Sequence, residues 1–559
     1  MLLSGTAPAG EGGPQDGAGG VSEHDFFSEL PIVLSVSRLA QPLDETPGAV
    51  TVIDRDMIRL SGARQVAELL RFVPGFQVSD SFEAAAPAVV YHGAFNAVDN
   101  QMQVLIDGRS VYASFIVGSV APGLQTLAVE DIERIEVLRG SNSAAYGARA
   151  FLGVINIVTR DPDTTGGVRL VKRNGGNGID DSYVRGGWAA GDARFRVSAG
   201  QRKDDGLEGA SGGIRVRHLN LRADLRPGPA DDLQLRAGAS EQDAGVGFAD
   251  LDRNAPRNRH FGFGYLQADW RRALGPDQDL AISLAHADER FADRFLFVDS
   301  GLFKDVPVDS GGVDSNDNIG VQHTFRSSDR LRVVWGGEWR REAVRSPPLY
   351  NADATLTTEF RRLYANGEWR LSPGLLLNAG GMYEDSSLSG SRLAPRLMLN
   401  WHLAPGQTLR VGASNADRPP SIFEKRADVD FVGHSPIPNG PVPVLVTIHS
   451  SGTVHAETLR TNEIGYLGEF RRIGLSADVR LFDERVGDGI GRRVVTDPRN
   501  FAPLPVVDFT NIDAFTIYGF EYQLQYRPRP GTRLIANPNF DPLTEPRPCV
   551  HWVLARFSP

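Results

Sequence analysis

Residues 131–141 read Asp-Ile-Glu-Arg-Ile-Glu-Val-Leu-Arg-Gly-Ser, and Ala145-Tyr-Gly147 and Gly153-Val-Ile-Asn-Ile-Val-Thr159 follow closely. Gly140 and Gly147 permit tight backbone turns on either side of a short helix. The run that ends at Thr159 is almost continuously apolar, which is typical of a buried strand. This stretch therefore predicts the closing section of a domain in which helices and strands are mixed.

The chain ahead of this stretch has the same mixed pattern. Residues 49–53 are mostly apolar and predict a short strand, and Asp54 is a suitable N-cap for the helical turn that follows. Residues 64–72 have apolar side chains at helical spacing, and Pro74-Gly75 ends that element. Further strands and a tight turn are expected at residues 89–92, at residues 102–106 and at Asp107-Gly108.

Four blocks in this region, in order along the chain, resemble the plug domain of TonB-dependent outer-membrane receptors. The resemblance implies a plug over residues 45–162 and a receptor that binds a scarce nutrient outside a Gram-negative cell and imports it. It also implies TonB, with its inner-membrane energising complex, as a partner, and binding followed by gated release without covalent chemistry. The blocks are residues 45–54, 66–76, 104–109, and 131–141 together with 145–147 and 153–159.

From about Gly166 the pattern changes to segments of ten to fifteen residues that alternate in polarity between turn residues. The alternation is strict over residues 475–482 and 520–526. This period of two is the signature of a transmembrane β-barrel, although a soluble sandwich, β-helix or propeller also alternates. The resemblance favours the barrel, because residues 417–424 and 459–466 are similar to barrel segments of the same family.

The expected fold is therefore mainly β, with a mixed α/β plug inside an antiparallel transmembrane β-barrel in the lipid of the outer membrane. The family has 22 strands, and about sixteen are recognisable here up to Tyr526, which places a partial barrel over residues 163–526. Tryptophans near strand ends would suit the membrane interfaces. They are Trp188, Trp270, Trp339, Trp369 and Trp401.

The two ends of the chain depart from this pattern. Residues 1–28 predict a disordered leader, and the N-terminus lacks the basic and apolar regions of a secretory signal. We interpret this as an incorrectly assigned start; a leader already removed and a protein that is not exported are the alternatives. Residues 527–559 are rich in proline, which paired central strands do not tolerate. Our hypothesis is that this tail is out of frame or that the gene is truncated. A truncated barrel that transports nothing is the alternative from a different functional class.

Composition excludes several other classes of protein. A net charge of −10 argues against nucleic-acid binding, and no run of eighteen apolar residues suggests a membrane helix. The single cysteine, Cys549, excludes an intramolecular disulfide framework or a cysteine-rich metal site. Sequence motifs of common hydrolases and nucleotide-binding enzymes are missing, so we expect neither an enzyme nor a resident cofactor or metal.

Energy coupling in the family uses a TonB box, a short extended segment that adds to TonB as a strand. Residues 29–44 hold the candidate and a linker, although the segment could equally be a strand that leads into the plug. The candidate residues are Leu30, Pro31, Ile32, Val33, Leu34, Ser35 and Val36.

Two plug positions are candidates for contact with the barrel wall. By resemblance, Arg139 is expected to pair with acidic groups on the inner wall, the alternative being an ordinary surface arginine. His92 stands where the family usually has arginine. It could weaken that interface or make it sensitive to pH, or it could simply be a packed side chain.

Apical plug loops are expected to contact the ligand, by analogy with the family. Aromatic and amide groups suit a ferric siderophore first, with a corrinoid as an alternative. A haem receptor is a further alternative, because three histidines lie between the two barrel segments, although they could be solvated loop residues. The ligand candidates are Phe82, Phe95, Asn96, Tyr112 and Phe115, and the histidines are His434, His449 and His455.

Overall fold

The computed structural model of the chain describes most of the plug and barrel regions. The described residues are 32–33, 37–80, 86–92, 101–116, 118–209, 211–249, 254–297, 306–435, 438–440, 442–512, 514–529, 532–537 and 539–540. Within them, no helix is long and apolar enough to cross a membrane.

The N-terminal domain is a mixed α/β plug, as the sequence predicted. Its elements are β1 (Ile32–Val33), β2 (Gln41–Pro42), β3 (Ala49–Ile53), α2 (Arg55–Ser61), α3 (Val66–Leu69), the 3-10 helix η1 (Leu70–Phe72), β4 (Phe76–Ser79), β5 (Ala88–Tyr91), β6 (Met102–Ile106), β7 (Arg109–Ser110), α5 (Ala121–Leu124), η2 (Val129–Asp131), β8 (Ile132–Arg139), α6 (Ser143–Tyr146), β9 (Gly153–Thr159) and η3 (Pro162–Thr165).

A five-stranded sheet in the order β3-β8-β9-β6-β7 forms the centre of the plug. Strand β9 lies in the middle of this sheet, antiparallel to β8 and parallel to β6, and its apolar side chains are almost all buried. Gly140 and Gly147 flank α6 with φ of +89° and +77°, which side chains with a Cβ rarely adopt. Asp54 caps α2 by accepting a hydrogen bond from the Met57 amide at 2.9 Å.

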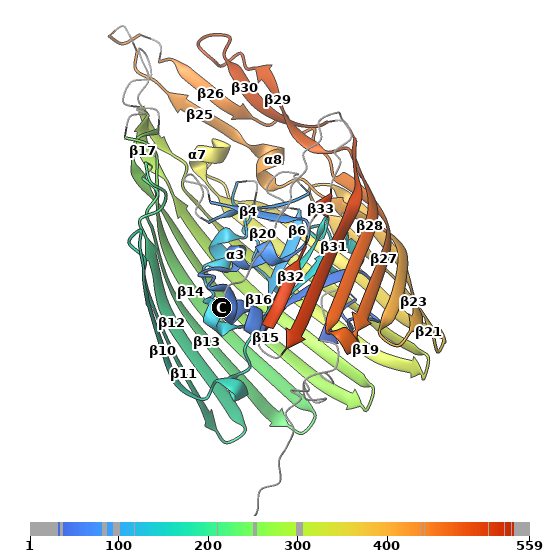
Figure 1. Ribbon diagram of the computed structural model, residues 1–559. Helices are drawn as coiled ribbons and strands as arrows, with labels where there is room; N and C mark the ends of the chain where they lie inside the picture. The colour runs from blue at the N-terminus through green and yellow to red at the C-terminus, as the bar shows by residue number, and fades with distance from the viewer. Residues whose placement is uncertain are drawn as a thin grey trace, which may run out of the picture.

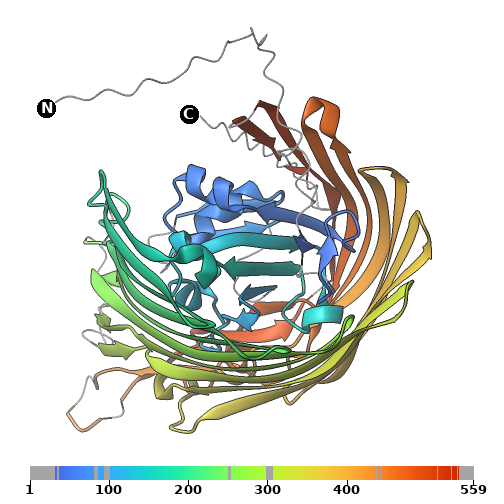
Figure 2. The same ribbon diagram turned by 90° about the horizontal axis from the view of Figure 1, so that it is seen from below.

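Most of the remaining chain forms one antiparallel sheet of eighteen strands that curls round the plug (Figures 1 and 2). From β10 to β32 each strand pairs with its neighbours in chain order, and the short strand β33 also pairs with β31; β10 and β33 end the strand order within the described residues. The strands are β10 (Gly167–Asn174), β11 (Asp180–Ala190), β12 (Ala193–Asp204), β13 (Ile214–Gly228), β14 (Asp231–Val246), β15 (Arg257–Gly275), β16 (Gln278–Ala292), β19 (Gly312–Ser328), β20 (Leu331–Arg345), β21 (Leu356–Ser372), β22 (Leu375–Ser386), β23 (Gly390–Ala404), β24 (Gln407–Arg418), β27 (Glu457–Phe470), β28 (Leu475–Gly487), β31 (Phe515–Arg529), β32 (Thr532–Ala536) and β33 (Asn539–Phe540).

The two ends of this sheet differ in loop length. At one end the strands turn back through two residues, as between Ala190 and Ala193 or between Gly275 and Gln278. At the other end long loops carry their own elements, and the strands of the longest loops project beyond the wall in Figure 1. Short periplasmic turns and long extracellular loops are typical of outer-membrane barrels, so the long loops mark the outer side. Their elements are β17 (Arg294–Phe297), β18 (Val306–Asp309), α7 (Pro347–Tyr350), α8 (Ile422–Arg426), β25 (Asp428–Val432), β26 (Val444–His449), β29 (Ile490–Thr496) and β30 (Pro505–Asn511), with the 3-10 helix η5 (Arg471–Ile473) in a turn at the opposite end.

Alternation sorts the side chains of each wall strand between two faces. In β28, Asp478 and Arg480 are buried against the plug, whereas Leu481 is 51% exposed on the outer face. Tryptophans also lie on that face, with Trp188 and Trp401 about half exposed. The predicted fold, mainly β with a plug inside an antiparallel barrel, is confirmed.

The strand count up to Tyr526 agrees with the sixteen expected, since β31 is the sixteenth strand of the sheet. The sheet nevertheless continues past Tyr526, where the sequence predicted the barrel to end. Strand β31 runs to Arg529, and β32 pairs with it from Leu524 onward. Pro528 is accommodated because the pairing is irregular between Tyr526 and Arg529, so no ladder hydrogen bond is required of it.

Candidate functional site

The plug meets the wall through Arg139, the last residue of β8. Its side chain is 1% exposed, and Nη1 donates to Glu521 of β31 at 2.9 Å. Its Nη2 donates to Asp478 of β28. One plug cation is therefore shared between carboxylates of two neighbouring wall strands.

A second buried guanidinium, that of Arg480 in the wall, extends this cluster. Arg480 pairs with Glu463 and Glu484, each at 2.7 Å, and lies 3.7 Å from Glu521. It also donates to the hydroxyl of the plug residue Tyr91 at 3.3 Å. Sequence reasoning did not single out these wall residues, although the strict alternation over residues 475–482 already placed Asp478 and Arg480 on one face.

His92 lies beside this charge cluster and is 1% exposed. Its Nε2 is 3.2 Å from Glu521 Oε1, and its ring centroid is 3.7 Å from that of Tyr91 and 4.6 Å from that of Phe482. The side chain is thus both packed against aromatic rings and adjacent to the acid that Arg139 contacts. Its effect on transport stays a prediction.

Polar contacts between plug and wall continue around the domain. Separating such an interface exposes groups that water can solvate, whereas the main apolar core lies largely within the plug. The plug is therefore held by contacts that can be exchanged for hydration. They include Arg149–Glu342 at 2.6 Å, Arg64–Asp181 at 2.7 Å, Arg64–Asp204 at 2.9 Å, Arg236–Asp107 at 3.2 Å and Tyr183–Asp131 at 2.6 Å.

Only part of the candidate TonB box can be located. Ile32 and Val33 form β1, which pairs with β2, and Val33 is buried in a small cluster of plug residues. Leu30, Pro31, Leu34, Ser35 and Val36 lie outside the described residues.

Arg38 follows this segment and anchors it to both plug and wall. Its backbone has φ of +60°, which is unfavourable for a residue with a Cβ. Nε donates to the Ala145 carbonyl at 2.7 Å, Nη1 donates to the Tyr364 hydroxyl at 2.9 Å, and Nη2 is 3.3 Å from Glu338. The guanidinium also stacks over the rings of Tyr146 and Tyr364. A pull on the N-terminal segment that had separated β1 from β2 would therefore act next on this side chain.

Replacing Arg38 with Met should loosen the segment without disturbing the plug core. We expect backbone amides of residues 37–41 to exchange with solvent about tenfold faster or more, because the hydrogen bonds to the Ala145 carbonyl and the Tyr364 hydroxyl and the ion pair with Glu338 are lost. Hydrogen-exchange mass spectrometry measures this directly. Arg326→Met is the matched control, because Arg326 pairs with Asp277 at an exposed turn. Equal exchange in the two variants would contradict the anchoring role.

The predicted ligand contacts fall into two groups. Phe82, Phe95 and Asn96 lie outside the described residues. Tyr112 and Phe115 are buried, at 5% and 7% exposed. Tyr112 lies under the Arg149 guanidinium at 3.3 Å, and the Phe115 ring is 5.0 Å from that of Phe291. In this conformation a ligand would reach either ring only after the elements above it had moved.

The elements above Phe115 are α7 and α8, which lie over the outer end of the plug (Figure 1). Ser421 and Glu424 form a capping box that fixes the start of α8. The helices contribute to an apolar cluster that covers Phe115. Its buried members are Phe115, Val344, Leu349, Tyr350, Ile422, Phe423, Ala427, Val429 and Phe509.

The three histidines considered as haem ligands are dispersed in the outer loops. His449 Nδ1 is 3.0 Å from Asp428 and 3.0 Å from Arg499, and the His455 ring contacts the Ala456 carbonyl at 3.3 Å. His434 is exposed. In the described part of the chain, no three His, Cys, Asp or Glu side chains are arranged to hold a metal ion.

A plug seated in a large antiparallel barrel by an ionic interface defines a class, the plugged barrel receptors of outer membranes. Residues 42–154 match the family "TonB-dependent Receptor Plug Domain", and residues 158–547 match the family "TonB dependent receptor-like, beta-barrel". The chain belongs to the TonB-dependent receptors.

Curated relatives include two kinds of outer-membrane protein. The iron-regulated outer membrane virulence protein of Vibrio cholerae is 26% identical over 530 residues, which cover 88% of this chain and 75% of that protein. The vitamin B12 transporter BtuB of Photobacterium profundum is 31% identical over 342 residues, or 57% of this chain and 51% of that protein. These relatives and the barrel fold support location in the outer membrane of a Gram-negative bacterium.

Solved structures agree on the fold. The siderophore receptor PirA from Pseudomonas aeruginosa has a TM-score of 0.69 at 19% identity, covering 88% of this chain and 84% of that chain. The ferric enterobactin receptor PfeA, in complex with BCV-L6, has a TM-score of 0.72 at 15% identity, covering 90% and 82%. At these identities the likeness concerns the fold alone.

Proposed function

We propose that this protein is an energised receptor that takes up a ferric siderophore and is driven by TonB. The observation that carries the proposal is the ionic interface between plug and wall. In it, Arg139, Arg149 and Arg64 of the plug form ion pairs with the wall. A plug held in this way closes the lumen and can still be displaced, because each separated group regains hydration. The iron-regulated relative and the siderophore receptors of the same fold support iron as the cargo.

The aromatic cluster over the plug supports a ligand with a large unsaturated surface. Phe115 of the plug, Tyr350 of α7 and Phe423 of α8 belong to one cluster. Aromatic rings on movable loops bind planar ligand groups with little loss of side-chain entropy. Loop opening would expose these rings to the ligand, and loop closure over it would commit the ligand to the plug.

A corrinoid is the second candidate for the cargo. The observation that favours it is the 31% identity to a vitamin B12 transporter over 342 residues, which is higher than the 26% identity to the iron-regulated protein. The aromatic cluster suits the planar corrin ring as well.

An uptake assay tests both candidates. The full chain is expressed behind an added secretion signal in a Gram-negative host that lacks its own siderophore and corrinoid receptors. Cells are given ⁵⁵Fe-labelled ferric enterobactin or ⁵⁷Co-labelled cyanocobalamin. We expect accumulation of the iron chelate in cells that have TonB and surface binding alone in cells that lack it. Accumulation of cyanocobalamin instead would establish the second candidate, and equal counts with and without TonB for both would overturn energised uptake.

The TonB contact has its own prediction. Replacing Leu34 with Pro removes a backbone donor and prevents the segment from adding to TonB as a strand. We expect uptake to fall at least tenfold while binding at the cell surface is unchanged. Leu34→Val, which keeps β-propensity, is the control. Full uptake by the proline variant would show that the box lies elsewhere.

A further inference from the structure

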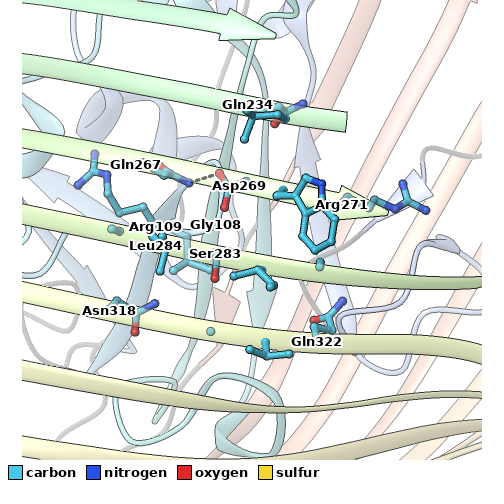
Figure 3. A pocket seen from close by; sticks show the side chains of 18 of the residues that line it. Gly108, Arg109, Gln234, Gln267, Asp269, Arg271, Ser283, Leu284, Asn318 and Gln322 are labelled. Atoms are coloured by element: carbon cyan, nitrogen blue, oxygen red, sulfur yellow. Dashed lines mark hydrogen bonds between the residues drawn. The ribbon is translucent and has the colours of Figure 1, made fainter. Parts of the chain in front are cut away.

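A cavity of about 600 Å³ lies between the plug and the inner face of the wall (Figure 3). On the plug side it is lined by Gly108, Arg109 and Ser110, from the hairpin between β6 and β7. The wall contributes polar side chains from consecutive strands, including the carboxylates of Asp224, Asp232, Asp269 and Glu338, and residues of the short turns line its periplasmic end. The polar wall residues used below are Gln267 of β15, Ser283 of β16, Asn318 of β19 and Arg340 of β20.

Arg109 is the cation of this cavity with the fewest hydrogen-bond partners among the described residues. It is 4% exposed, and none of its three guanidinium nitrogens has a hydrogen-bond partner among the described residues. The group stacks on the ring of Tyr265 at 3.8 Å, and the Tyr265 hydroxyl donates to Asn220 at 2.9 Å. In Figure 3 the Arg109 side chain lies between Gln267 and Asn318 of the wall.

Asp107, the acidic residue nearest to Arg109 in the sequence, is already bound to other groups. Asp107 pairs with Arg236 at 3.2 Å and accepts hydrogen bonds from the Thr159 amide and hydroxyl at 2.8 and 2.6 Å. Burial lowers the pKa of the Arg109 guanidinium below its ordinary value, and Tyr265 and Asp107 offset this only in part. The buried charge of Arg109 is therefore poorly compensated.

Arg340 brings a second guanidinium to the same cavity. It is 3% exposed, and its Nε lies 2.9 Å from Glu342, with which it forms an ion pair. It also donates to Asn316 at 3.0 Å and to Ser110, the neighbour of Arg109, at 3.3 Å. Its Nη2 has no hydrogen-bond partner among the described residues. Two cations on opposite sides of one cavity thus keep donors free. The hydroxyl of Ser283 and the amide of Asn318 line the same space and can donate as well.

We propose that this cavity is a binding site for an oxyanion, a carboxylate or a phosphate, with Arg109 as its principal ligand. An unpaired buried cation is costly, whereas the planar fork of a guanidinium matches the oxygens of such a group in a bidentate contact. The oxyanion would sit against Arg109 and accept further hydrogen bonds from Arg340 and the wall. This inference is independent of which nutrient the receptor imports.

The same chemistry can come from two sources, a free anion in the periplasm or an anionic group of a larger molecule between plug and wall. Inorganic phosphate is the probe for a small free anion, and citrate is the probe for a carboxylate carried by a larger molecule. Thermal unfolding of the full chain in a neutral detergent is followed at increasing concentrations of each, with ionic strength held constant by sodium chloride. We expect a saturable rise of the unfolding midpoint by several degrees.

Arg109→Met is the main variant, and its effect should have two parts. The rise with phosphate or citrate should be lost, and the midpoint without anion should be higher than that of the parent chain, because an uncompensated charge has been removed. If Arg109 only packs against Tyr265, its replacement should lower the unfolding midpoint without anion, because packing is lost and no charge penalty is relieved. Arg109→Lys keeps the charge without the fork and should retain a weaker response. It also serves as the test variant if the methionine variant does not fold.

Arg361→Met is the matched control, because Arg361 is exposed on the outer face of the wall. It should respond to anions like the parent chain. A response to phosphate alone assigns the site to a free ion, and a response to citrate as well shows that a larger anionic ligand fits. The proposal is overturned if neither anion shifts the parent chain, or if the control loses the response along with the Arg109 variants.

Discussion

Arg139→Met should lower the protection of the β8 amides against hydrogen exchange by about two to four orders of magnitude. Removing one partner of a buried ion pair costs about 3–5 kcal/mol, because the other charge is left uncompensated. Among the residues that the structure describes, Glu521 would then have Arg480 at 3.7 Å and the His92 ring at 3.2 Å as ion-pair partners. Exchange through local opening of the plug reports this loss directly.

A double substitution shows whether the pair is the cause. Adding Glu521→Gln to Arg139→Met removes the stranded negative charge and should restore part of the protection. Arg59→Met is the control on the plug surface, where the side chain is 60% exposed, and should have no effect. If the two substitutions lower protection additively, Arg139 and Glu521 do not act together. Other contacts between plug and wall would then hold the plug in place.

Gly75→Ala should destabilise the plug by about 2–5 kcal/mol through two separate effects. The backbone at Gly75 has φ of +83°, which costs a residue with a Cβ about 1–2 kcal/mol. A Cβ there would also lie 2.4 Å from the ring of Tyr91 and 2.6 Å from Glu521 Oε1, and overpacking of a buried site costs about 1–3 kcal/mol more. Tyr91 would have to move, and Arg480 would lose its hydroxyl contact.

Gly108→Ala separates the two effects. Gly108 has φ of +82°, almost the same as Gly75, but nothing lies within 4 Å of a Cβ built there. Only the backbone cost of about 1–2 kcal/mol is expected, so amides of β4 and β5 should exchange much faster in the Gly75 variant than amides of β6 do in the Gly108 variant. Similar losses at both positions would mean that packing against Tyr91 contributes nothing.

Much of the plug could be predicted from the sequence, because its signals are local. Glycines at 140 and 147, the N-cap at Asp54 and the apolar run that ends at Thr159 each specify backbone conformation within a few residues. The wall strands could be predicted for a similar reason, since a period of two separates inward from outward side chains in every strand. The sequence predicts an end of the sheet that is too early, because proline is unfavourable in a paired strand, whereas Pro528 lies in an irregularity of the pairing that tolerates it.

The sequence by itself determined the family, the mixed plug and the alternating wall, together with Arg139 and His92 as candidates for contact with that wall. The tertiary structure alone decided which side chains meet. Glu521 lies 382 residues from Arg139, and Asp478 lies 339 residues from it. The burial of Phe115 under α7 and α8, that of Tyr112 under Arg149, and the unpaired charge of Arg109 beside the cavity are equally non-local. The physical reason is that backbone preferences act between neighbours in the chain, whereas ion pairs and cavities depend on closure of the sheet round the plug, which no local pattern encodes.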